Sequence, residues 1–211
     1  MIQCRYMSSL AETGFGNYSS VAKMGRFWFQ WRSLSPIPLF ILLVVLPPDF
    51  VPSVSQALFA GLVIVLAESL RIWAVGHAGS ATRTRGDSVP VLCTAGPYRF
   101  VRNPLYIANA AMYTACGILF GFSGLSILIL FYTAIQYIFI VAFEEETLTR
   151  EFGEAYTQYC EKVNRWMPSF TPSCAASDHQ FDLGRGLRSE RSTFYSMSLM
   201  AGLFLIKKFL L

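Results

Sequence analysis

The fold follows from one stretch, NPLYIANAAMYTACGILFGFSGLSILILFYTAIQYIFIVAF, at residues 103–143. Its 41 residues include no Asp, Glu, Lys or Arg. A bilayer core about 30 Å thick takes about 20 helical residues, so this length predicts two membrane helices. The segment GFSG at 121–124 lies at the centre and favours a tight turn. We therefore predict a helical hairpin with helices over 104–120 and 125–143.

The composition agrees with a membrane protein. Hydrophobic residues make up 54% of the 211 residues and charged residues only 14%, where soluble domains carry about 25% charged residues. The 18 Phe, 10 Tyr and 4 Trp exclude a disordered chain. Five scattered cysteines without a CxxC pair argue against a disulfide-stapled secreted domain.

Three further apolar runs predict additional helices. Residues 33–48 and 50–67 are uncharged and separated by Pro47, Pro48 and Asp49. The second of these helices is expected to continue to about Gly76, because Glu68 and Arg71 share one helical face and can form a pair. Glu68 is then either an end charge that reaches the interface or a group facing a cavity.

The fifth run, 192–206, is short for a span unless Lys207 and Lys208 reach the interface. The predicted fold class is therefore all-α and polytopic, with about five transmembrane helices. The predicted organisation is a cytosolic segment at 1–32, two membrane helices at 33–76, a linker, hairpin and catalytic region at 77–168, a polar linker at 169–192 and a membrane or interfacial helix at 193–211.

The basic residues predict the orientation. Lys and Arg gather before the first predicted span, between the second and third, and after the fourth, whereas the connections at 47–53 and 121–124 have none. Since Lys and Arg favour the cytosolic side, the polar regions are expected in the cytosol. The net charge of +4 then reflects orientation and contact with membrane lipids, with no nucleic-acid partner expected. His77 and His179 are isolated, so no metal site is expected.

Two cytosolic segments flank the hairpin. The first, RTRGDSVPVLCTAGPYRFVRNPLY at 83–106, is too long for a simple connection and contains apolar residues that argue against disorder. It ends at Asn103 and Pro104, a predicted N-cap and first helical residue. Because a helix N-terminus presents unpaired N–H groups, this start can hold an anionic group.

The second segment, FEEETLTREFGEAYTQYCEKVNRWMP at 143–168, predicts a helix that leaves the membrane with one apolar face. The residues on that face recur at helical spacing. Three consecutive carboxylates at the membrane edge are costly unless they are solvated or matched by cations, which leaves a solvated face and a functional cluster both open. The apolar face comprises Leu148, Phe152, Tyr156, Tyr159 and Val163, and the carboxylates are Glu144, Glu145 and Glu146.

Together, GPYRFVRNPLY at 96–106 and EEETLTREFGEAYTQYCEKVNRWMP at 144–168, on either side of the hairpin, resemble the isoprenylcysteine carboxyl methyltransferase and phospholipid methyltransferase superfamily. The resemblance implies an integral membrane enzyme that uses S-adenosylmethionine without a Rossmann domain. It implies cofactor contacts at Pro90, Val91, Leu92, Cys93, Tyr98, Asn103, Pro104, Leu105, Tyr106 and Glu144. Two catalytic candidates accompany them: Arg102 to orient an anionic acceptor and Glu145 to accept a proton from an amine.

Two positions depart from the pattern. Asn103 stands where the carboxyl methyltransferases usually have His, and Ile140 stands where they have an Arg that holds the substrate carboxylate. The acceptor is therefore open among carboxylate, amine and thiol groups on a lipid-like or lipidated molecule entering from the bilayer. The alternatives are a phospholipid N-methyltransferase, an NADPH-dependent enzyme of the steroid-reductase type with Arg83 and Arg85 near the phosphate, and a non-catalytic scaffold.

Overall fold

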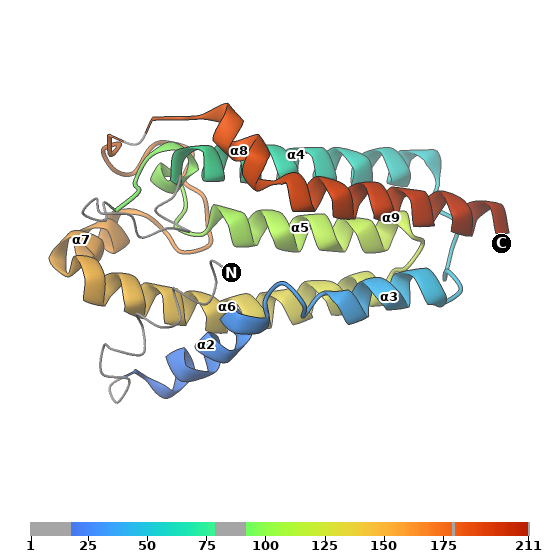
Figure 1. The fold of residues 1–211 in the computed structure, drawn as a ribbon, viewed down its shortest axis with the longest axis horizontal. Helices are drawn as coiled ribbons and strands as arrows, with labels where there is room; N and C mark the ends of the chain where they lie inside the picture. Colours follow the sequence, from blue (N-terminus) through green and yellow to red (C-terminus); the bar gives the residue numbers. More distant parts are fainter. Residues whose placement is uncertain (1–17, 79–91, 179, 211) are drawn as a thin grey trace.

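The structure, a computed structural model, describes residues 18–78, 92–178 and 180–210, and every regular element in these parts is helical (Figure 1). This confirms the all-α prediction. The elements are α2 Ser20–Trp31, α3 Ile37–Val45, α4 Val54–Ala78, the 3₁₀ helix η3 Gly96–Arg99, α5 Pro104–Leu119, α6 Gly124–Phe152, α7 Glu154–Lys162, α8 Leu183–Ser189 and α9 Arg191–Leu210.

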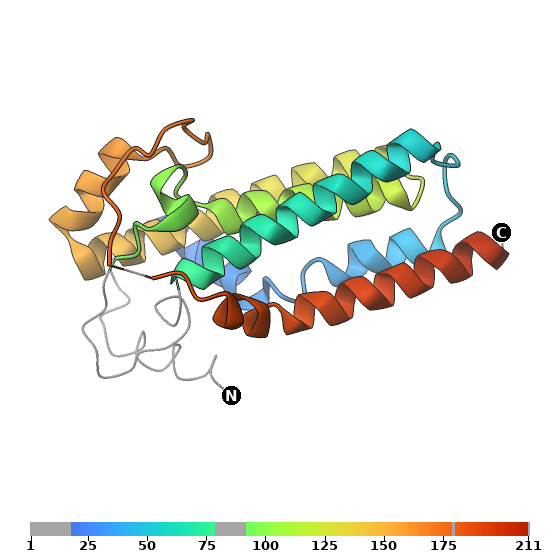
Figure 2. The same ribbon diagram turned by 90° about the horizontal axis from the view of Figure 1, so that it is seen from above.

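The uncharged stretch forms α5 and the larger part of α6, which lie side by side and run in opposite directions (Figures 1 and 2). The turn between them uses Gly121 at φ +82°, a conformation that side chains other than glycine rarely adopt. Helix α6 continues past the predicted end at residue 143 because its polar residues are still good helix formers. It ends where Gly153 adopts φ +55°, so the predicted continuous apolar helix breaks there into α6 and α7.

Helices α4 and α6 are each long and apolar enough to cross a membrane. Large apolar side chains remain exposed on both, including Leu62 and Val65 on α4 and Phe131 and Ile138 on α6. Contiguous exposed apolar surface of this kind fits contact with lipid. Helix α5, with 16 residues, is apolar but shorter.

The first predicted membrane helix, 33–48, is wrong in its length. Only α3, with 9 residues, is helical there, and at 1.5 Å per residue it covers about 14 Å of a core about 30 Å thick. Leu46 leaves the helix in an extended conformation, because the proline that follows it disfavours helical geometry in the preceding residue.

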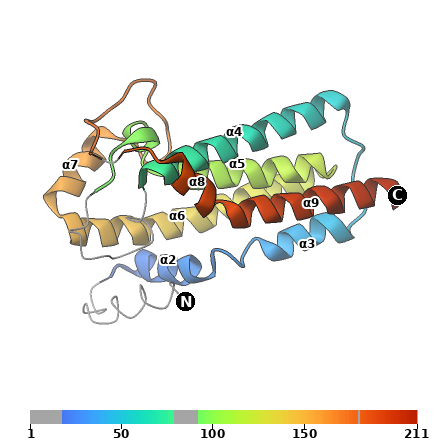
Figure 3. The same cartoon turned by 45° about the horizontal axis from the view of Figure 1, so that its top comes forward.

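Helix α2 lies within the segment predicted as a cytosolic N-terminal stretch, and it packs along α6 (Figure 3). Its N-cap is Ser19, whose hydroxyl accepts a hydrogen bond of 3.2 Å from the backbone N–H of Ala22. Gly25 allows the close approach, since a Cβ at this position would lie 1.9 Å from the carbonyl oxygen of Phe139.

The predicted pair on α4 is confirmed, with Arg71 Nε 3.3 Å from Glu68 Oε2. Glu68 is only 5% exposed, so it faces the interior and does not reach the interface. Arg71 also donates hydrogen bonds to Asn109 on α5 and to Glu190, which precedes α9. One guanidinium thus joins α4 and α5 to the start of α9. The predicted polar linker 169–192 contains the short helix α8.

The two connections that lack Lys and Arg, 47–53 and 121–124, lie together at one end of the bundle. The backbone N–H groups of Asp49 and Phe50 both donate to the carbonyl oxygen of Gly121, over 2.8 and 3.1 Å. At the same end, Lys207 Nζ donates to the carbonyl oxygens of Leu43 and Leu46, each over 2.6 Å. Helices η3 and α7 lie at the opposite end (Figure 2).

Candidate active site

The two ends of the uncharged stretch meet through Tyr106 and Glu144. The hydroxyl of Tyr106, in the first turn of α5, donates a hydrogen bond of 2.9 Å to Oε1 of Glu144 on α6. The ring of Tyr106 also packs against Tyr137, with the ring centroids 4.7 Å apart. Antiparallel helices return to the side they left, so residues 38 positions apart come into direct contact.

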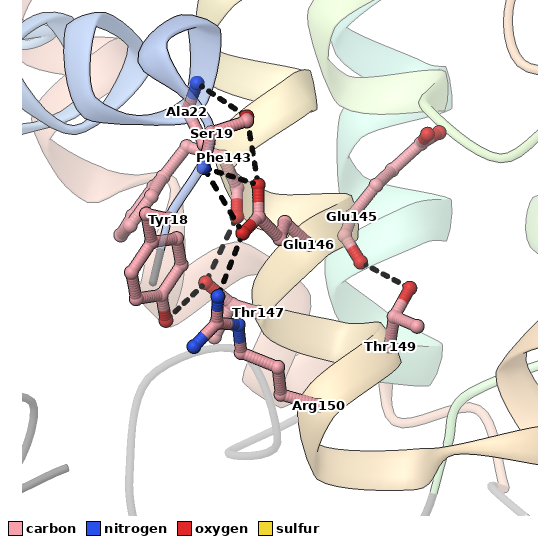
Figure 4. A network of polar contacts seen from close by, with 9 residues as sticks. All are labelled: Tyr18, Ser19, Ala22, Phe143, Glu145, Glu146, Thr147, Thr149 and Arg150. Atoms are coloured by element: carbon pink, nitrogen blue, oxygen red, sulfur yellow. Dashed lines mark hydrogen bonds and ion pairs between the residues drawn. The ribbon is translucent and has the colours of Figure 1, made fainter. Parts of the chain in front are cut away.

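The three consecutive glutamates point to three different parts of the chain. Successive residues on a helix are about 100° apart, so Glu144 faces α5 while its neighbours face other elements. Figure 4 shows the side chains of Glu145 and Glu146 pointing apart. Glu146 accepts hydrogen bonds from the Ser19 hydroxyl, over 2.9 Å, and from Arg150, over 2.8 Å. The cluster is therefore matched by specific partners and is not merely a solvated face.

Glu145 is held by two guanidinium groups. Arg102 Nε lies 3.5 Å from Oε1, and Arg165 donates to both carboxylate oxygens, over 3.1 and 2.5 Å. The hydrogen bonds to Glu145 raise the pKa of Arg165. Both carboxylate oxygens of Glu145 are therefore engaged within the protein, and Arg102 has a carboxylate partner there. The roles predicted for Glu145 as a proton acceptor and for Arg102 as a residue that orients the acceptor stay predictions.

Arg165 was not among the residues predicted from the sequence. It is placed by a segment that runs beside the start of α5, where the backbone N–H of Arg102 donates to the carbonyl oxygen of Asn164 over 2.9 Å. Farther along, Ser169 N donates to Phe100 O over 3.0 Å. The signal in the sequence that could have identified this residue is its place as a cation immediately before Trp166, Met167 and Pro168, at the end of the second cytosolic segment.

Asn103 occupies the predicted N-cap position but does not cap α5 with its side chain. Its amide donates to the carbonyl oxygen of Arg165 over 3.2 Å instead. Pro104 is buried at the first helical position, and it carries no N–H. The N–H groups of Leu105 and Tyr106 at the start of α5 therefore receive no side-chain cap, which leaves this end suited to an anionic group.

The apolar face of the second segment packs against the linker. Tyr156, Tyr159 and Val163 form a buried cluster that includes Leu92, and the Tyr159 hydroxyl donates to the carbonyl oxygen of Tyr98 over 2.8 Å. This packing holds η3 against α7.

Cys93 and Tyr98 lie in the same neighbourhood as the glutamate. Burial raises the pKa of the Tyr98 phenol, and the nearby Cys93, Tyr159 and Glu144 raise it further. The structure thus brings Cys93, Tyr98, Tyr106 and Glu144 into one region. Pro90 and Val91 lie outside the described residues.

Comparison with known proteins agrees with this region. Residues 55–155 match a family model described as phospholipid methyltransferase. This match, over slightly less than half of the chain, supports the predicted superfamily. The matched residues include α5 and α6 with both Tyr106 and Glu144, so the methyltransferase match covers the helices that form the pair.

Among curated proteins, the chain is 27% identical over 157 residues to methanethiol S-methyltransferase 1 of Bradyrhizobium diazoefficiens. The alignment covers 72% of the chain and 52% of the relative, so the chain spans about half the length of the curated relative it matches. No solved structure shows a significant match. The comparisons therefore support a membrane methyltransferase.

The donor set fits S-adenosylmethionine. Its ammonium group and hydroxyls need a carboxylate such as Glu144, and its carboxylate needs N–H donors such as those at the start of α5. Tyrosine rings near Glu144 suit a positively charged sulfonium.

Proposed function

We propose that the protein is an S-adenosylmethionine-dependent integral membrane methyltransferase that acts on a lipophilic or amphipathic acceptor. The observation that carries this proposal is the hydrogen bond between Tyr106 and Glu144, which joins the two predicted halves of the site within the methyltransferase match. When bound, the cofactor supplies an electrophilic methyl group on a positively charged sulfur.

In this proposal the protein binds and orients the cofactor. Glu144 holds its ammonium or ribose hydroxyls, with Tyr106 fixing the position of the carboxylate. The start of α5, at Asn103, Pro104 and Leu105, faces its carboxylate. Leu92, Cys93 and Tyr98 cover it, together with Pro90 and Val91. Alignment of acceptor and methyl group with exclusion of water supplies most of the rate gain expected for such a transfer.

The acceptor enters from the bilayer in this proposal. The exposed apolar surfaces of α4 and α6 support contact with membrane lipids, and the site lies at the end where the basic residues gather, which supports the cytosolic side. We propose the five-helix membrane arrangement for α3, α4, α5, α6 and α9, with α3 entering the core only in part. The names of the family and of the relative suggest a phospholipid amine or a thiol as the acceptor group.

Isothermal titration calorimetry of the full chain in detergent tests the cofactor. We expect S-adenosylhomocysteine to bind with a Kd on the order of micromolar and NADPH to give no heat. Absence of S-adenosylhomocysteine binding at about 1 mM would overturn the proposal. Binding of NADPH instead would support the reductase alternative, and absence of both would support the scaffold.

A second assay addresses the acceptor. The chain in nanodiscs is incubated with radiolabelled S-adenosylmethionine and, separately, with total lipid extract, long-chain thiols or prenylcysteine analogues. We expect label in an acceptor that partitions into the membrane. Label found only in water-soluble acceptors would contradict the lipophilic substrate class.

A further inference from the structure

Helix α2 has one face toward solvent or lipid and one face toward α6. Its outward face is a stripe of exposed apolar side chains at helical spacing, Val21, Met24, Phe27 and Trp31, and Leu34 just beyond the helix continues the stripe; each is 47–53% exposed. A helix with such a stripe and basic residues beside it is typical of the membrane interface. The inward face carries Ala22 and Gly25, both buried.

Arg32 belongs to the inward face. Ala22, Gly25, Phe29 and Arg32 recur at i, i+3, i+7 and i+10, and Arg32 keeps helical dihedrals at the end of α2. An arginine on the packed face of an interfacial helix is unusual, because a guanidinium is costly to remove from water.

One contact before Arg32 and one after it show which part of α6 lies beside this residue. Before it, the ring of Phe29 packs on Phe143 with the centroids 5.7 Å apart. After it, Ser35 Oγ accepts a hydrogen bond of 2.5 Å from Gln136 Nε2. Arg32 therefore lies opposite residues 136–143 of α6, the part of the helix that immediately precedes Glu144. It is close enough to both Tyr106 and Glu144 to contribute to their electrostatics.

Within the described part of the chain, the guanidinium of Arg32 contacts an aromatic ring and a carbonyl oxygen and forms no ion pair. It lies 3.7 Å from the centroid of the Phe29 ring and donates to the carbonyl oxygen of Phe29 over 3.3 Å. Across residues 18–78, 92–178 and 180–210, no carboxylate lies within 4.0 Å of it. Arg102, Arg150 and Arg165, in contrast, each have a glutamate partner.

We propose that Arg32 binds the anionic head group, a carboxylate or thiolate, of an acceptor whose apolar chain lies in the bilayer beside α2. This inference rests on the proposed methyltransferase function and narrows its substrate class. The alternative source of an anion is the carboxylate of the cofactor. We favour the acceptor for two reasons. The carboxylate of the cofactor already has N–H donors at the start of α5, and Arg32 lies on a different side of α6, where α2 packs.

An anionic acceptor also removes the need for a base. A lone pair of the acceptor oxygen or sulfur forms the bond to the methyl carbon, the carbon–sulfur bond of the sulfonium breaks, and its electron pair stays on that sulfur. No proton is released in this step. Arg32 acts as a positioning residue that raises the local concentration of the charged head group.

Octanoate and octanol serve as probes, because they share a chain and differ in head-group charge. Binding to the full chain in phosphatidylcholine nanodiscs is followed by tryptophan fluorescence, with protein-free nanodiscs subtracted. The variants are Arg32→Gln and Arg32→Lys, and the control is Lys23→Gln, which removes the same charge from an exposed position of α2. S-adenosylhomocysteine titrations accompany each variant.

We expect octanoate to bind the parent chain at least about tenfold more tightly than octanol, and Arg32→Gln to remove this difference. Arg32→Lys should retain part of it, while octanol and S-adenosylhomocysteine affinities stay within about twofold in all variants. Lys23→Gln should leave all three affinities within the same range.

Equal binding of octanoate and octanol to the parent chain would overturn the inference even if Arg32→Gln does not fold. A tenfold loss of S-adenosylhomocysteine affinity in Arg32→Gln would also overturn it, because the cation would then serve the cofactor carboxylate. Failure of the proposed function is separate, since it appears as absence of S-adenosylhomocysteine binding to the parent chain.

Discussion

The hydroxyl of Tyr106 donates a hydrogen bond of 2.9 Å to Oε1 of Glu144, and this contact links the first turn of α5 to the part of α6 where the uncharged stretch ends. A hydrogen bond to a carboxylate fixes the carboxylate in one orientation. The two glutamates that follow Glu144 on α6 have different partners. Glu145 faces the cations Arg102 and Arg165, whereas Glu146 faces α2.

Glu144→Gln and Tyr106→Phe should both weaken cofactor binding. Because a hydrogen bond to a charged group contributes about 1.5–3 kcal/mol, we expect Glu144→Gln to raise the Kd for S-adenosylhomocysteine about 10- to 100-fold and Tyr106→Phe to raise it less. Calorimetry on the double variant should show a smaller loss than the sum of the two single losses, since the residues act together. The control is Glu161→Gln on the exposed side of α7. Unchanged affinity in both single variants would refute this map of the site.

Glu145→Gln should lower stability more than it lowers cofactor affinity. The substitution leaves Arg102, whose side chain is 12% exposed, without its partner, and we expect a loss of about 2 kcal/mol in the free energy of unfolding, or a fall of roughly 4–8 °C in Tm. Thermal unfolding in detergent measures this change. Glu154→Gln, on an exposed residue whose carboxylate accepts from Gln158 four residues on, should change Tm by less than about 2 °C. A Tm equal to that of the parent would show that the two ion pairs contribute nothing measurable.

Gly25→Ala should disrupt the packing of α2 on α6. A Cβ at Gly25 meets the backbone of Phe139, which cannot move aside as a flexible side chain would, and we expect a loss of about 1–3 kcal/mol. The matched control is Gly61→Ala on α4, where a Cβ meets nothing within 4 Å and helix propensity favours alanine by about 1 kcal/mol. Tm should therefore fall in the first variant and stay equal or rise in the second. The same direction of change in both would contradict the close contact of α2 and α6.

Cys93 should react slowly with alkylating reagents. Burial raises the pKa of its thiol. Hydrogen bonds with the backbone of Ala95 and the side chain of Ser177 lower this pKa, but they offset the effect of burial only in part. Because the thiolate is the reactive form, the alkylation rate should keep rising with pH beyond about 8.5, the pKa of a free cysteine. Peptide-resolved mass spectrometry after iodoacetamide treatment at several pH values measures the rate.

The same labelling tests whether Cys93 covers the cofactor. S-adenosylhomocysteine should protect Cys93 and leave Cys174 unprotected, because the proposed cofactor contacts include Cys93 and do not include Cys174, which packs against the Tyr156 and Tyr159 cluster. Burial raises the pKa of the Cys174 thiol as well, so the two cysteines differ in place rather than in the direction of the shift. Equal protection of both residues, or of neither, would argue against the placement of Cys93 beside the cofactor.

The hairpin-like pair α5 and α6 was predictable because its signals are local. An absence of charge over 41 residues, a glycine at the turn and a proline at a helix start each act through their own backbone or through the bilayer. The pairing of Glu68 with Arg71 was predictable for the same reason, since both lie on one turn of one helix. The contact of Tyr106 with Glu144 followed from the return of the chain to the same side.

The helix α2, the short α3 and the partners of the glutamates required the folded chain. Nothing local shows that Gly25 faces Phe139, that Arg165 comes to Glu145 or that Ser19 caps α2 while it bonds to Glu146. Spacing along a helix sets the direction of a side chain, but the segment that meets it is chosen by packing over long sequence distances. Composition and local backbone chemistry thus suffice for the helices and their breaks. The choice of cation for each carboxylate depends on how α2 and residues 164–174 pack against α6 and the start of α5. The placement of Arg32 opposite residues 136–143 depends on the same packing.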